Sequence, residues 1–131
     1  MDKAMIAERA AQMKTRADLL LLLNDIRHDE LAEAGREEDY HPFTQPKFNF
    51  YINPNHTQGR YREFYIPKRS GGRRRISAPR TGTYKYMLHA LNLLLGSLYT
   101  PSLSAMGFAP GRSIVTGAEK HVGQHYVFNT D

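Results

Sequence analysis

Two glycines, Gly71 and Gly72, separate two runs of strand-forming residues. Residues 61–67 read Tyr-Arg-Glu-Phe-Tyr-Ile-Pro, and residues 73–79 read Arg-Arg-Arg-Ile-Ser-Ala-Pro. Aromatic and β-branched residues bounded by glycine and proline are typical of a β-hairpin. Glycine supplies the positive φ angle that a tight turn requires. The sequence therefore predicts strands near 60–67 and 73–78, joined by a cationic turn.

Positive charge is concentrated in the same segment. The 131-residue chain has a formal net charge of +5, but residues 60–80 alone hold eight lysines and arginines against one glutamate. Residues 1–40 are acidic, with six basic and ten acidic side chains. Such a local excess of cations indicates a polyanionic partner such as nucleic acid. The alternative is a solvated loop whose charges serve only solubility.

The composition excludes several other classes of protein. The sequence has no cysteine, which rules out disulfides and thiolate metal sites. No apolar run approaches the roughly 18–20 residues that a membrane-spanning helix needs, so we expect no membrane partner. The first residues, Met-Asp-Lys-Ala, lack the pattern of a secretory signal. We expect a cytoplasmic protein built as one compact domain.

Helical patterns lie on both sides of the hairpin. Residues 1–16 are rich in helix formers, and Asp18 is expected to cap a second helix that begins near Leu19. The apolar residues of this second helix recur at helical spacing and predict one buried face: Leu19, Leu22, Leu23 and Ile26. A second apolar stripe predicts a helix over residues 83–98, formed by Met87, Leu88, Leu91, Leu94, Leu95 and Leu98.

The other segments are predicted to be short or irregular. Pro42, Pro46 and Pro54 indicate an irregular connector over residues 40–59, in which Phe48, Phe50 and Ile52 form a short strand or anchor the loop. Ser113 is expected to cap a short helix that runs to about residue 121. Residues 124–130 are expected to form a final strand. Helices combined with a hairpin give an α+β fold class.

Three segments, in this order, resemble the beginning of bacterial reverse transcriptases of the retron and group II intron type. Residues 64–79 resemble the first conserved block of that family, the hairpin of the fingers subdomain. Residues 105–121, which include Gly-Phe-Ala-Pro-Gly-Arg-Ser-Ile, resemble the second block, although Gly117 stands where the family usually has asparagine. Residues 126–131, Tyr-Val-Phe-Asn-Thr-Asp, resemble the strand that delivers the first catalytic aspartate of the palm.

The resemblance implies an organisation and a function. Residues 1–40 would be a helical N-terminal extension, 41–59 the connector, and 60–131 the fingers and the start of the palm of a right-hand polymerase. The parent would be an RNA-directed DNA polymerase that extends a DNA or RNA primer on an RNA template with dNTPs and Mg²⁺. The family's Tyr-x-Asp-Asp segment does not occur in the sequence, so residues 1–131 alone are expected to be inactive.

Two other functions stay open at this point. A non-catalytic module that retains only the fingers would bind nucleic acid through the same cations. A protein-interaction domain would instead use the acidic helices of residues 1–40 against a basic partner.

The resemblance also assigns roles to individual residues. Lys68 and Arg74 match residues that contact the triphosphate of the incoming nucleotide, and Asp131 matches a catalytic ligand of Mg²⁺. The other candidates for contacts with nucleic acid are Arg69, Arg73, Arg75, Arg112 and Ser113. For Arg112 and Ser113, contacts that only stabilise the fold are an equal alternative.

Strand alternation complicates the assignment of the arginines. Arg74 shares a face with Ile76, whereas Arg73 and Arg75 face the other way. If Ile76 points to the core, Arg73 and Arg75 are the freer pair, unless a bulge near the glycines shifts the register.

Overall fold

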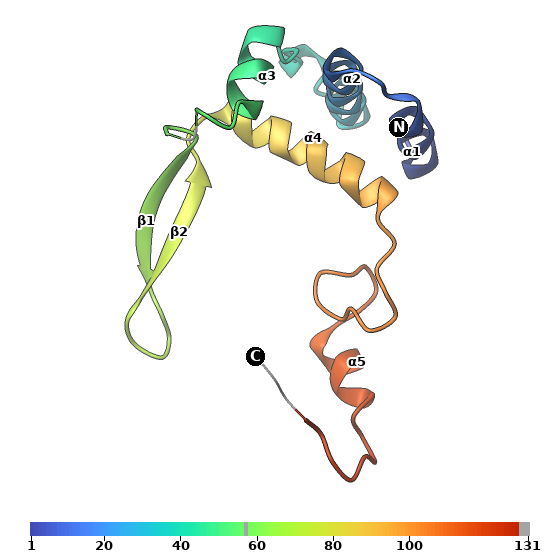
Figure 1. The fold of residues 1–131 in the computed structure, drawn as a ribbon, viewed down its shortest axis with the longest axis vertical. Coiled ribbons are helices and arrows are strands. Elements are labelled where there is room, and N and C mark those ends of the chain that lie inside the picture. The colour runs from blue at the N-terminus through green and yellow to red at the C-terminus, as the bar shows by residue number, and fades with distance from the viewer. Residues whose placement is uncertain (57, 129–131) are drawn as a thin grey trace. The chain divides into compact units, whose positions relative to one another are not determined.

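The structure of the chain is a computed structural model that describes residues 1–56 and 58–128. The chain divides into two units, Met1–Leu98 and Tyr99–Asp131. Within the described residues, the first contains four α-helices and a two-stranded antiparallel sheet, and the second contains one short α-helix (Figure 1). This combination confirms the predicted α+β fold class.

The elements of the first unit follow one another with short connections. In chain order they are α1 (Lys3–Gln12), α2 (Arg16–Glu33), the 3-10 helix η1 (Glu37–Asp39), α3 (Gln45–Ile52), β1 (Tyr61–Pro67), β2 (Arg73–Pro79) and α4 (Gly82–Leu98). Both predicted strands and the predicted helix after the hairpin therefore lie within one residue of their expected bounds.

Helix α2 begins earlier than the sequence predicted, because Thr15 rather than Asp18 is its N-cap. The Thr15 hydroxyl accepts a hydrogen bond from the Asp18 amide over 3.2 Å. The Asp18 carboxylate in turn accepts bonds from the amides of Thr15 (2.8 Å) and Lys14 (3.0 Å). This is a reciprocal capping box, in which the acidic residue occupies the third helical position instead of the cap.

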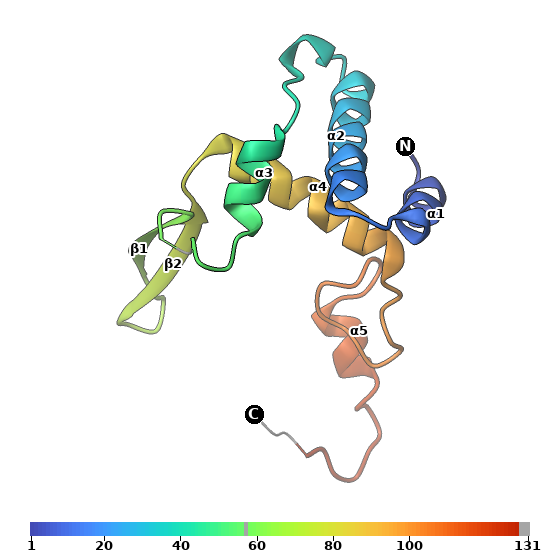
Figure 2. The same cartoon turned by 45° about the horizontal axis from the view of Figure 1, so that its top comes forward.

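The core lies where α1, α2 and α3 pack against α4 (Figures 1 and 2). Leu22, Leu23 and Phe48 are each 1% exposed, and Ala90 of α4 is fully buried. A small residue at this position lets neighbouring helices approach α4 closely. The predicted stripe of α4 is correct for Met87 and Leu94 but wrong at its end, because Leu95 and Leu98 are more than half exposed.

Helix α3 corrects the prediction of an irregular connector. Pro46 lies in the first turn of this helix, where its missing N–H would have no intrahelical partner in any case. Thr44 occupies the N-cap position. Phe48 is buried in the core while Phe50 is 46% exposed, so the aromatic residues follow a helical pattern and form no strand.

The second unit contains helix α5 (Ile114–Glu119). As predicted, Ser113 caps it: the Ser113 hydroxyl accepts from the Thr116 amide over 3.3 Å, and the Thr116 hydroxyl accepts from the Ser113 amide over 2.8 Å. The predicted final strand is wrong for residues 124–128, which form no strand. A strand is held by hydrogen bonds to a neighbour, and these residues have no such ladder in the described part of the chain.

Within residues 1–56 and 58–128, no helix is both long and apolar enough to cross a bilayer.

Candidate nucleic-acid interface

The turn of the hairpin depends on its two glycines. Residues 68–72 join the strands, and Gly71 and Gly72 have φ angles of +85° and +78°. The Gly71 amide donates to the Lys68 carbonyl over 3.1 Å, and the Lys68 amide donates to the Gly72 carbonyl over 3.0 Å. Two successive positive φ angles are costly for residues with a Cβ, so the turn requires glycine at both places.

The register divides the hairpin into two faces of different chemistry. Seven consecutive pairs run from Tyr61 opposite Pro79 to Pro67 opposite Arg73. Since the series is uninterrupted, no bulge shifts the arginines, and residues two apart share a face. We call one side the Arg74 face, which comprises Arg62, Phe64, Ile66, Arg74, Ile76 and Ala78. We call the other the Tyr65 face, which comprises Tyr61, Glu63, Tyr65, Pro67, Arg73, Arg75, Ser77 and Pro79.

The Arg74 face is apolar with cations at its ends. Phe64 lies opposite Ile76, and Ile66 lies opposite Arg74. Phe64 and Ile66 are 41% and 39% exposed, so this face does not pack into the helical core. Ile76 is half-buried and is not part of the core, so the condition under which Arg73 and Arg75 would be the freer pair is not met, and all three arginines are exposed.

The Tyr65 face is polar. Tyr65 lies directly opposite Arg75, and its side chain is 60% exposed. Arg75 approaches the carboxylate of Glu63 at 3.6 Å, and the Ser77 hydroxyl is 3.5 Å from the same group. Both arginines of this face are exposed, and Glu63 lies on the side of Tyr65 that is nearer the base of the hairpin.

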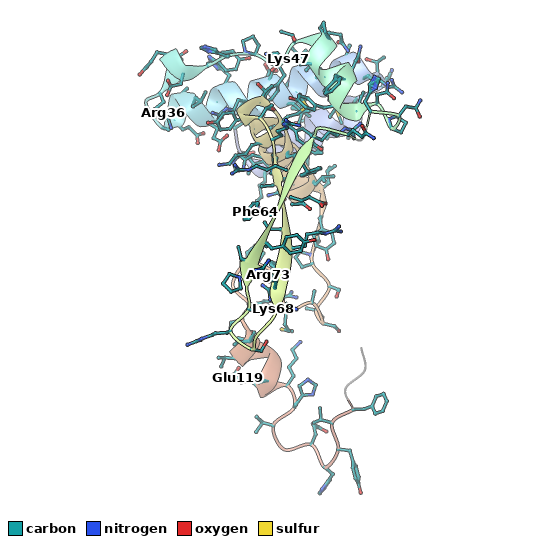
Figure 3. All side chains as sticks on the ribbon, turned by 90° about the vertical axis from the view of Figure 1, so that its left-hand side faces the viewer. Arg36, Lys47, Phe64, Lys68, Arg73 and Glu119 are labelled. Atoms are coloured by element: carbon teal, nitrogen blue, oxygen red, sulfur yellow. The ribbon has the colours of Figure 1, made fainter. Side chains whose placement is uncertain are left out.

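Lys68 lies at the tip of the hairpin (Figure 3), and Arg69 follows it in the turn. The bond from Lys68 to Gly72 extends the strand pairing by one residue beyond Pro67. Alternation then puts Lys68 on the same side as Ile66 and Arg74. Arg69 is exposed in the turn itself.

A cluster of tyrosines joins the base of the hairpin to the helices. The Tyr51 and Tyr84 rings stack with a centroid distance of 4.6 Å, and the Tyr61 ring meets Tyr84 edge-on at 5.4 Å. The Tyr84 hydroxyl donates to the Tyr61 hydroxyl over 3.1 Å, and the hydroxyls of Tyr51 and Thr81 lie 2.7 Å apart. Burial, strengthened by the bond to Tyr61, raises the pKa of Tyr84 to about 12. The three rings and their hydroxyl contacts hold the first residue of β1 against α4.

Two arginines next to the strands have structural contacts. The Arg60 guanidinium donates to the Asn53 carbonyl at the end of α3, and the Arg60 carbonyl accepts from the Arg80 amide over 2.8 Å. Arg60 thus ties α3 to the hairpin. The contacts of Tyr51, Tyr84 and Arg60 were not predicted from the sequence. Tyr84 begins the buried stripe of α4, three residues before Met87, and this spacing was the available signal.

Arg112 and Ser113 belong to the second unit. The Arg112 guanidinium donates to the carbonyls of Ser102 and Ala105, and the contact with Ala105 measures 2.6 Å. Ser113 is occupied by the cap of α5. Both residues thus have fold-stabilising contacts, and their role in binding nucleic acid stays a prediction. Phe108, in the loop before them, is fully exposed with a φ angle of +58°, so it is no packing anchor within the described residues.

The metal prediction rests on Asp131, which lies outside the described residues. No group of three or more His, Asp or Glu side chains within residues 1–56 and 58–128 is arranged to hold a metal ion. The Mg²⁺ ion and Asp131 as its ligand therefore stay predictions.

Comparison with known proteins identifies a relative. Over 71 residues the chain is 45% identical to the retron Mx65 reverse transcriptase of Myxococcus xanthus. The chain is related to a reverse transcriptase. The matching part is 54% of this chain but 16% of the relative, so the chain spans a small fraction of the relative's length. No family model and no solved structure matches the chain.

Proposed function

We propose that residues 1–131 form the N-terminal fingers region of an RNA-directed DNA polymerase, and that the hairpin binds the nucleotide and the nucleic acid. The observation that carries this proposal is the 45% identity to a retron reverse transcriptase over 71 residues. The exposed cations of the hairpin, whose first strand contacts α4 through Tyr61 and Tyr84, supply the chemistry.

On this proposal the Arg74 face receives the incoming dNTP. Arg74 offers a planar fork of donors to a phosphate, and Lys68 offers a compact charge on the same side. The apolar pair of Phe64 and Ile76 is the adjacent surface for the nucleoside. Arg69, Arg73 and Arg75 contact phosphates of the template or primer. Carboxylates of the palm, later in the chain, would complete the Mg²⁺ site together with Asp131. The parent enzyme would be of the retron type or of the group II intron type.

A binding experiment tests the nucleic-acid part. Purified residues 1–131 should bind a fluorescent RNA template annealed to a DNA primer, with an affinity that falls as salt rises. Replacing Lys68, Arg73, Arg74 and Arg75 together by alanine should abolish most of this binding and reduce its salt dependence. If the fourfold variant binds RNA as well as the original chain, the hairpin is not the interface and a protein-interaction domain is favoured.

Two further measurements separate a polymerase from a binding module. The 131-residue chain should not extend the primer with dNTPs and Mg²⁺, and detectable extension would contradict its inactivity. The coding sequence that follows codon 131 should encode a strand-flanked Tyr-x-Asp-Asp within about one further domain length. A stop codon there would leave a non-catalytic module that binds nucleic acid.

A further inference from the structure

The proposed binding of the incoming nucleotide uses the Arg74 face and leaves the side chains of the Tyr65 face without a role. The Tyr65 face presents an exposed aromatic ring with two exposed arginines on the neighbouring strand. We propose that this face binds single-stranded nucleic acid, with one base stacked on Tyr65 and the flanking phosphates on Arg73 and Arg75. The inference rests on the proposed function, because it assumes that the hairpin meets nucleic acid.

The ring of Tyr65 is available for stacking. Tyr61, on the same face, packs edge-on against Tyr84, but the described residues provide no aromatic partner for Tyr65. An exposed ring next to arginine is the arrangement with which proteins bind unpaired bases, because every base has a π face and every nucleotide has a phosphate. A base pair within a duplex has both faces covered by its neighbours, so it cannot use the ring.

The spacing of the arginines suits an extended strand. Arg73 and Arg75 are two residues apart on β2, which places their Cα atoms about 6.8 Å apart along the strand. This is comparable to the separation of successive phosphates in an extended single strand. Tyr65 lies directly across from Arg75, and Pro67 lies across from Arg73. The ring and the two guanidinium groups thus form a patch for one or two nucleotides.

Glu63 sets the boundary of this patch. Its carboxylate is 3.6 Å from the Arg75 guanidinium, on the side of Tyr65 toward the hairpin base. A phosphate that binds Arg75 competes with this exposed ion pair, and such pairs contribute little free energy. The bound strand therefore runs toward the tip, where Arg69 and Lys68 add positive charge, and Glu63 repels it from the base.

Fluorescence anisotropy with matched variants tests the stacking on Tyr65. The probes are a labelled single-stranded RNA, a DNA of the same sequence, and a duplex of that DNA with its complement. Tyr65→Ala should weaken binding of the single strands about tenfold, as expected for the loss of a stacked base, and change duplex binding by less than about twofold. Tyr65→Phe should bind normally because it keeps the ring. Phe50→Ala removes an exposed ring of α3, outside the hairpin, and is the control.

Charge variants test the phosphate contacts. The double variant Arg73→Ala and Arg75→Ala should lower the salt dependence of single-strand binding by about 1.4 in the log–log slope, which corresponds to two phosphates. Glu63→Gln should tighten single-strand binding, because it removes the competing carboxylate. A role of Glu63 in stability alone would predict no such gain.

Several outcomes would overturn the inference. Equal losses for Tyr65→Ala and Phe50→Ala, or a loss for Tyr65→Ala that is as large on the duplex, exclude stacking on this face. Tyr65→Leu, which keeps apolar volume without a ring, decides the question if Tyr65→Ala does not fold. If the original chain binds no nucleic acid, the proposed function fails as well. If it binds nucleic acid but no variant at Tyr65 changes the affinity, only the inference fails.

Discussion

The hydroxyl of Tyr84 in α4 donates a hydrogen bond to the hydroxyl of Tyr61, the first residue of β1, over 3.1 Å. This bond links the helical core to the base of a hairpin whose strands are otherwise largely exposed. Because Tyr84 also stacks on Tyr51, the orientation of the hairpin depends on three aromatic side chains from three different elements.

A double-mutant cycle on Tyr61 and Tyr84 should reveal this coupling. Tyr61→Phe removes one partner of the bond while it keeps the ring, and we expect it to lower the free energy of unfolding by about 1 kcal/mol. Tyr84→Phe should cost at least as much, since Tyr84 is the more buried partner. The double variant should cost less than the sum of the two, as measured by urea denaturation. Additive losses would show that the two hydroxyls do not interact.

Helix α3 gives a second pair of variants. Phe48 is 1% exposed, so Phe48→Ala should lower the free energy of unfolding by about 3–5 kcal/mol through the cavity that it leaves. Phe50 is two residues away and 46% exposed, and Phe50→Ala should cost less than about 1 kcal/mol. Thermal unfolding followed by circular dichroism measures both. Similar costs at the two positions would favour a connector in which neither ring is an anchor.

Local signals predicted the hairpin, α4 and the cap of α5. The turn glycines, the apolar period of α4 and Ser113 each act within a few residues, and such signals can be read from the sequence alone. The division of the hairpin into two faces also followed from alternation, once the register proved continuous.

Features that depend on distant residues could not be predicted in this way. Pro46 permits a helix only because it falls in the first turn. Phe48 stabilises this helix by packing in the core against residues far along the chain. The pairing of Tyr61 with Tyr84 joins residues that are 23 positions apart. The strand expected over residues 124–130 needs a neighbouring strand to pair with, and the strand propensity of the residues does not show whether one is present. The role of Asp131 lies outside the described residues.

The capping box of α2 predicts a dependence of stability on pH. Hydrogen bonds from the amides of Lys14 and Thr15 lower the pKa of Asp18 below its ordinary value of 3.8. A carboxyl with a lowered pKa stabilises the folded state above pH 3.8, and this contribution is lost as the pH falls through the lowered value. Asp18→Asn should therefore be less stable than the original chain at pH 7, and the difference should shrink below about pH 4.

Urea denaturation between neutral and strongly acidic pH measures this difference. Thr15→Ala, which removes the other half of the box, should cost about 1 kcal/mol at pH 7. A difference between Asp18→Asn and the original chain that stays constant down to the lowest pH would contradict the role of the carboxylate.

The same substitution should have opposite effects at two glycines. Gly71 has a φ angle of +85° and Gly96 lies inside α4, and an added Cβ would meet no atom within 4 Å at either position. An added Cβ therefore causes no steric clash at either glycine, and the two positions differ only in their backbone conformation. Gly71→Ala should lower the free energy of unfolding by about 1–2 kcal/mol because alanine disfavours the left-handed region. Gly96→Ala should raise it by about 0.5–1 kcal/mol because alanine favours the helix. Chemical denaturation measures both, and a stabilising Gly71→Ala would show that the turn adopts another conformation in solution.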